Sequence, residues 1–113
     1  MKAILATAAL ALMLAAPASS ATALTGTVGP GFTISLTAGG KNVSKLKAGT
    51  YTLKISDKSN IHDFHLSGPG VNKTTSVGGT GSQTWTVKLK KGKYHFQCII
   101  HPYSMNTFLT VTK

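Results

Sequence analysis

The chain has no arginine and only two acidic residues, Asp57 and Asp63, against 12 lysines, so its formal net charge is +10 at pH 7. So few carboxylates exclude chemistry that needs paired acids, such as glycoside hydrolysis. The absence of arginine argues against base-specific recognition, because arginine is the usual bidentate donor to guanine. We therefore expect no nucleic-acid partner. The lysines predict attraction to an acidic partner protein or to an anionic envelope surface.

Long hydrophobic runs are also scarce, and the longest covers residues 3–16 near the N-terminus. It follows Lys2 and precedes the small residues of segment 17–23, which is the pattern of a secretory signal peptide and its cleavage site. The run is short for a membrane span, which needs roughly 20 apolar residues. We therefore predict an exported protein without a membrane span.

This leader divides the chain into two parts. We place the signal peptide at residues 1–23 and one domain at residues 24–113, because Ala21-Thr22-Ala23 fits the A-x-A cleavage pattern. Cuts after Ala18 or Ala21 are the alternatives. No repeat or linker divides the remainder, so we expect a single small domain and a monomer.

Cysteine is nearly absent, since Cys98 is the only one, and no disulfide can form within the chain. A lone cysteine in an exported protein indicates intermolecular pairing, a reactive thiol or a metal ligand. Domains of this size have thin cores and many are stabilised by disulfides or metals. Of these three roles, that of metal ligand can be checked against the residues that lie near Cys98 in the sequence.

Apolar and polar residues alternate with a period of two along most of the domain, which predicts strands. The alternating apolar residues are Phe32, Ile34 and Leu36; Tyr51, Leu53 and Ile55; Trp85, Val87 and Leu89; and Tyr94, Phe96 and Cys98. Residues 61–67 and 107–112 add two further strand-like runs. Turn residues separate these runs, and we find no amphipathic helix. The pattern predicts an all-β fold, a small antiparallel sandwich or barrel.

Potential metal ligands cluster in the segment Cys98-Ile-Ile-His101-Pro-Tyr-Ser-Met105. A thiolate, imidazoles and a weak thioether form the ligand set of a mononuclear blue copper site. A second imidazole must come from upstream, from His62 or His65. These two lie on opposite faces of a regular strand because their separation is odd, and periodicity alone does not choose between them.

The segments Asn60-Ile-His62-Asp63-Phe64 and Tyr94-His-Phe-Gln-Cys98-Ile-Ile-His101-Pro-Tyr-Ser-Met105 resemble the plastocyanin/azurin family of small cupredoxins. The resemblance implies a Greek-key β-sandwich that holds one type 1 copper ion. It also implies equatorial ligands at His62, Cys98 and His101, and an axial ligand at Met105. Asp63 departs from the family, which usually has an asparagine that ties the two ligand loops together. A carboxylate cannot donate those hydrogen bonds.

The resemblance implies a one-electron carrier whose exit to a partner is the edge of His101. We expect Lys88, Lys90, Lys91 and Lys93 to steer an acidic redox partner. The alternatives are a module that binds and delivers copper without electron transfer and, more remotely, a metal-free sandwich. We expect no enzyme, because multicopper enzymes need more histidines than the four present, and no Ser-His-Asp grouping is apparent.

Overall fold

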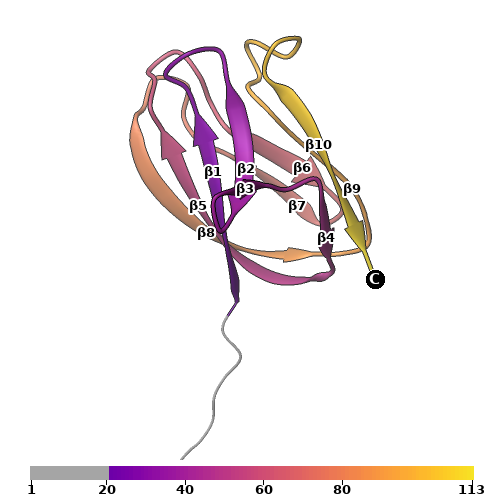
Figure 1. Ribbon diagram of the computed structural model, residues 1–113. Coiled ribbons are helices and arrows are strands. Elements are labelled where there is room, and N and C mark those ends of the chain that lie inside the picture. The colour runs from indigo at the N-terminus through magenta and orange to yellow at the C-terminus, as the bar shows by residue number, and fades with distance from the viewer. Residues whose placement is uncertain (1–20) are drawn as a thin grey trace, which may run out of the picture.

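A computed structural model describes residues 21–113, which form two five-stranded sheets packed face to face (Figure 1). The first sheet has the order β3 (Lys41–Asn42), β2 (Ile34–Ala38), β1 (Thr22–Val28), β5 (Gly49–Asp57) and β8 (Gly81–Leu89). The second has the order β4 (Lys45–Lys47), β10 (Asn106–Thr112), β9 (Gly92–Gln97), β6 (His65–Gly68) and β7 (Val71–Thr74). Within this part of the chain there is no helix, and so none that could cross a membrane.

The core lies between the two sheets and is made by the alternating residues. Tyr51, Leu53 and Ile55 are buried from the first sheet, and Tyr94 and Phe96 from the second. Their polar neighbours point outward, because successive side chains of a strand lie on opposite faces. The predicted all-β sandwich is confirmed.

Two strand pairs differ from the antiparallel arrangement that the sequence suggested. β1 pairs with β5 in parallel, and β4 pairs with β10 in parallel, so both sheets are mixed. Parallel neighbours need a long connection between them. The chain between β1 and β5 supplies it, because β2, β3 and β4 lie within that connection. Alternation along one strand carries no information about such partners.

The run 61–67 is not one continuous strand. β6 begins only at His65, and residues 58–64 form a loop between β5 and β6. Side chains hold this loop: the Ser59 amide donates to Asp57 Oδ1 at 3.1 Å, and the Ile61 amide donates to Ser59 Oγ at 3.2 Å. These side-chain acceptors take the place of the carbonyl groups of a neighbouring strand, and the strand ends here. His62 and His65 therefore do not lie on one regular strand, and the expectation that they occupy its opposite faces does not apply.

The predicted signal peptide lies outside the described residues, except for its last three positions. β1 already begins at Thr22, and Thr22 and Ala23 pair with Tyr51 and Thr52 of β5. A cut after Ala23 would remove the first two residues of this strand. A cut after Ala18 or Ala21, the two alternatives, would leave the strand whole.

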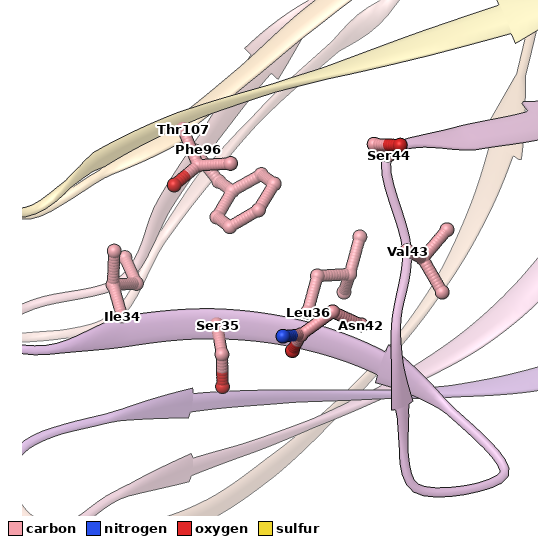
Figure 2. A pocket seen from close by; sticks show the side chains of 8 residues that line it. All are labelled: Ile34, Ser35, Leu36, Asn42, Val43, Ser44, Phe96 and Thr107. Carbon is pink, nitrogen blue, oxygen red and sulfur yellow. The ribbon is translucent and has the colours of Figure 1, made fainter.

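The sheets separate along the side where β2, β3 and β4 lie, and a cleft of about 260 Å³ opens there. Figure 2 shows Phe96 reaching from the second sheet toward Leu36 in the first. The full lining is Ile34, Ser35, Leu36, Asn42, Val43, Ser44, Phe96 and Thr107. None of these side chains is charged, so the cleft offers packing surface rather than acid–base or metal-binding groups.

Candidate metal centre

The potential ligands meet at one end of the sandwich. The loop between β5 and β6 and the loop between β9 and β10 lie at this end (Figure 1). His62 lies in the loop between β5 and β6, whereas Cys98 and His101 lie in the loop between β9 and β10. Cys98 directly follows β9 and continues the inward alternation of Tyr94 and Phe96, so its thiol is fully buried. The alternation that builds the core therefore also aims the sulfur at the site.

Three donor atoms form a small triangle. The two imidazole Nδ1 atoms, of His62 and His101, lie 3.1 Å apart, and Cys98 Sγ lies 3.8 Å from the first and 3.5 Å from the second. A point equidistant from all three atoms lies about 2 Å from each, which is near the length of metal–imidazole bonds and slightly short for metal–thiolate bonds. The triangle therefore fits a single metal ion.

The loop that carries two of these donors is closed by its own backbone. The His101 amide donates to the Cys98 carbonyl at 3.1 Å, the Met105 amide to the His101 carbonyl at 2.9 Å, and the Cys98 amide to the Met105 carbonyl at 3.0 Å. Met105 is fully buried at the point where the loop rejoins the sheet, directly before β10. The positions of Cys98 and His101 are thus set by hydrogen bonds within the protein.

Asp63 joins the two ligand loops, and it does so as a hydrogen-bond acceptor. Asp63 Oδ1 accepts from the Ile99 amide at 2.7 Å, and Oδ2 accepts from the Thr74 hydroxyl at 3.0 Å. The Asp63 amide itself donates to Cys98 Sγ at 3.4 Å. The carboxylate donates no hydrogen bond, as expected, but it still links the loops because the Ile99 backbone donates and the carboxylate accepts.

The other two histidines lie away from the triangle. His65 is on β6, and its Nε2 contacts Asn72 Oδ1 at 2.6 Å. His95 is on β9, where it contacts Asn106 and stacks on the Phe108 ring at 4.6 Å between centroids. The structure thus brings His62, and not His65, to Cys98 and His101.

Phe32 belongs to the site, although the sequence placed it in a strand. Its ring meets the His62 and His101 imidazoles edge to face, at centroid distances of 5.1 and 4.7 Å. Phe32 lies in the turn before β2 and is 56% exposed. Gly29-Pro30-Gly31 directly before it is the sequence signal that could have indicated a turn here.

Burial governs the electrostatics of the site. Loss of solvent raises the pKa of the Cys98 thiol, so a metal that binds there must displace a firmly held proton. Burial also raises the pKa of Asp57 at the end of β5, while the Ser59 amide partly offsets this by stabilising the charged form. Asp57 and Asp63, the only acidic side chains of the sequence, are thus both enclosed near this end of the sandwich.

The donor chemistry selects among metals. His62 Nε2 is buried without a hydrogen-bond partner, which leaves Nδ1 as the nitrogen that faces the other donors. Two imidazole nitrogens and one thiolate, with a buried thioether in the same loop, suit copper in both of its common oxidation states. Hard ions such as Mg²⁺ and Ca²⁺ prefer oxygen ligands, and none of the three clustered donors is oxygen.

Comparisons with known proteins agree with this architecture. No protein-family model and no curated protein matches the chain. Among solved structures, reduced rusticyanin superposes with a TM-score of 0.61 at 18% identity, covering 84% of this chain and 82% of its own. Rusticyanin from Thiobacillus ferrooxidans gives 0.56 at 20% identity, with 83% and 79% covered.

Auracyanin A, a blue copper protein from Chloroflexus aurantiacus, gives a TM-score of 0.52 at 17% identity, covering 82% of this chain and 100% of its own. Each of these likenesses covers more than four fifths of this chain. The chain therefore has the cupredoxin fold, with two histidines and one cysteine brought together at one end of its sandwich.

Proposed function

We propose that this protein is a one-electron carrier that holds a single copper ion between His62, Cys98 and His101, with Met105 as a weak fourth ligand. The observation that carries the proposal is the triangle of donor atoms, whose sides of 3.1, 3.5 and 3.8 Å match one soft metal ion. Bound copper would supply a one-electron couple. No bond to a substrate is needed, so we propose no enzymatic activity.

The protein's own residues favour rapid electron exchange by holding the donors in place. The side chains of His62, Cys98 and Met105 are 0% exposed, which keeps water from the donor atoms. Asp63 and the hydrogen-bonded 98–105 loop hold the two ligand segments at a fixed separation. A site that barely rearranges between two oxidation states has a small structural barrier to gaining or losing an electron.

His101 is the only one of the three clustered donors that reaches the surface, where it is half-buried. The large exposed apolar side chains around this end are Phe32, Ile61, Ile99, Ile100 and Tyr103, with exposures from 47% to 100%. We call these five residues the apolar collar. Such an apolar surface around the partly exposed His101 supports brief docking of a partner directly over the edge of its ring.

We propose export and an acidic redox partner, but the lysines named in the sequence analysis act from a distance. Lys90 and Lys91 form the turn between β8 and β9, and all six residues of β9 separate them from Cys98, about 20 Å at the usual strand rise. None of the five collar residues is charged. The lysines thus attract the partner, and the apolar collar contacts it.

Addition of Cu(II) to the purified protein, followed by visible and EPR spectroscopy, tests the proposal. We expect an intense thiolate-to-copper band and a narrow parallel hyperfine splitting. Cys98→Ser should abolish the band, and His62→Ala should weaken or abolish it, whereas His65→Ala is the matched control and should retain it. A colourless protein with an ordinary square-planar signal would refute the assignment.

Stopped-flow exchange with small one-electron reagents then distinguishes a carrier from a copper-delivery module. We expect repeated reduction and reoxidation without loss of copper. A protein that shows the blue band, cycles poorly and transfers copper to an added chelator would instead be a delivery module.

A further inference from the structure

The surface of the described domain carries lysines without acidic side chains to balance them. Asp57 is 5% exposed and Asp63 is 1% exposed, and both accept hydrogen bonds from backbone amides. They are the only acidic side chains in the sequence. Any anion that approaches the described surface therefore meets positive charge with no side-chain carboxylate to repel it.

Three of these lysines surround a groove that the proposed copper site does not use. The groove has a volume of about 430 Å³ and runs between β7 and β8. Its lining is Gly70, Val71, Asn72, Lys73, Thr86, Val87, Lys88 and Lys90. Lys73 lies on β7, Lys88 lies on β8, and Lys90 directly follows β8. The side chain of Lys90 extends toward the turn before β7, where its Nζ would lie 3.7 Å from a Cβ placed on Gly70.

Both walls of the groove are edge strands. β8 is the last strand of the first sheet and β7 is the last strand of the second, so each pairs on one side only. Their outer edges carry backbone N–H groups that no neighbouring strand uses. These donors lie beside the lysines and can bind the oxygen atoms of an anion together with the ammonium groups.

We propose that this groove, formed by residues 70–73 and 86–90, binds a linear phosphate polymer. The groove follows two strands, which suits an extended chain better than a flat bilayer or a folded protein. Lysine ammonium groups bind phosphate as point charges, and three of them line the groove with no exposed acidic side chain beside them. The inference goes beyond electron transfer and does not depend on bound copper.

The location of the groove has a consequence for orientation. Lys88 and Lys90 lie at the end of β8 and just beyond it, at the far end of β9 from the Cys98 loop. A polymer in the groove would leave the apolar collar around His101 free. The protein could thus be retained on an anionic polymer while its opposite end meets a partner.

Binding of inorganic polyphosphate to the purified protein, measured over a range of salt concentrations, tests the proposal. The groove variant combines Lys73→Gln, Lys88→Gln and Lys90→Gln. The control variant combines Lys41→Gln, Lys45→Gln and Lys47→Gln, whose lysines lie on β3 and β4 at the opposite edges of the two sheets. Both variants lose the same charge, and all six lysines are exposed.

We expect the groove variant to bind about 100-fold more weakly, because each lysine close to a polyanion contributes a factor of roughly five. The slope of log affinity against log salt concentration should fall by about 2 to 3 for the groove variant. The control variant should lose less than about tenfold, through the general field alone. Equal losses in the two variants would overturn the proposal, since net charge would then explain the binding.

Two further ligands separate the phosphate polymer from other anions. Poly-glutamate presents carboxylates on a linear chain, and vesicles of phosphatidylglycerol present phosphate on a flat surface. We expect both ligands to bind more weakly than polyphosphate. For each of them, the loss of affinity should be the same in the groove variant and in the control variant. Tighter binding of either ligand, with a selective loss in the groove variant, would reassign the groove to that ligand and refute the proposal. Thermal melts of both variants in the absence of ligand establish that they are folded.

Discussion

Removal of the Asp63 carboxylate should destabilise the fold before any metal is bound. Asp63→Ala deletes the acceptor of the Ile99 amide at 2.7 Å and of the Thr74 hydroxyl at 3.0 Å. Hydrogen bonds to a charged group contribute about 1.5–3 kcal/mol each, and both of these are partly buried. After allowance for water that can reach the Ile99 amide, we expect a loss of about 3 kcal/mol in the free energy of unfolding.

Asp63→Asn should cost much less, under about 1 kcal/mol, because its carbonyl oxygen can still accept from the Ile99 amide. Urea denaturation of the metal-free protein, followed by Trp85 fluorescence, measures both values. Thr74→Val is a second control that removes only the hydroxyl partner, and we expect a loss of about 1 kcal/mol. Equal destabilisation by the alanine and asparagine variants would refute the view that the carboxylate links the ligand loops by accepting a hydrogen bond.

Three other changes have defined outcomes. Burial raises the pKa of Asp57 above its ordinary 3.8, so the folded state binds this proton more tightly than the unfolded state does. The free energy of unfolding therefore falls as pH rises through the unfolded-state pKa and then the folded-state pKa of Asp57. Asp57→Asn should raise the melting temperature of the metal-free protein at pH 7 and leave it nearly unchanged at pH 3. Gly68→Ala should cost about 3 kcal/mol in urea denaturation, because the new Cβ would lie 2.3 Å from the ring of buried Tyr94. Gly78→Ala is the control, because Gly78 is exposed and a Cβ there meets no atom within 4 Å. Mass spectrometry of protein secreted by a host that expresses the full chain tests the predicted cleavage. A first residue at Leu24 would confirm the cut after Ala23, whereas Thr22 would contradict it and show the alternative cut after Ala21, which retains all of β1.

Most of the sandwich could be predicted from local alternation. The inward positions of Tyr51, Leu53 and Ile55 follow from a period of two, and the structure buries all three. The parallel partnership of β1 and β5 could not be predicted in this way, because it depends on where a distant segment returns. The loop 58–64 was also missed, since an apolar run alone does not reveal that the Asp57 and Ser59 side chains take over backbone bonds.

The site was predictable in part for the same kind of reason. The close spacing of Cys98 and His101 limits their separation and identifies the ligand loop without knowledge of the fold. The choice of His62 over His65 came only from the family resemblance; in the structure His62 lies beside Cys98 and His101, whereas His65 lies on β6. Phe32 could not be found, because its contacts with both imidazoles arise from a turn on the other sheet.

Burial of both carboxylates also affects how copies of this protein meet one another. With lysines alone charging the described surface, two copies repel at every pH well below the lysine pKa, and the repulsion is strongest in dilute buffer. Electron exchange between two copies through their His101 edges should therefore be slow in dilute buffer and accelerate as salt is added, opposite to the salt dependence of exchange with an acidic partner.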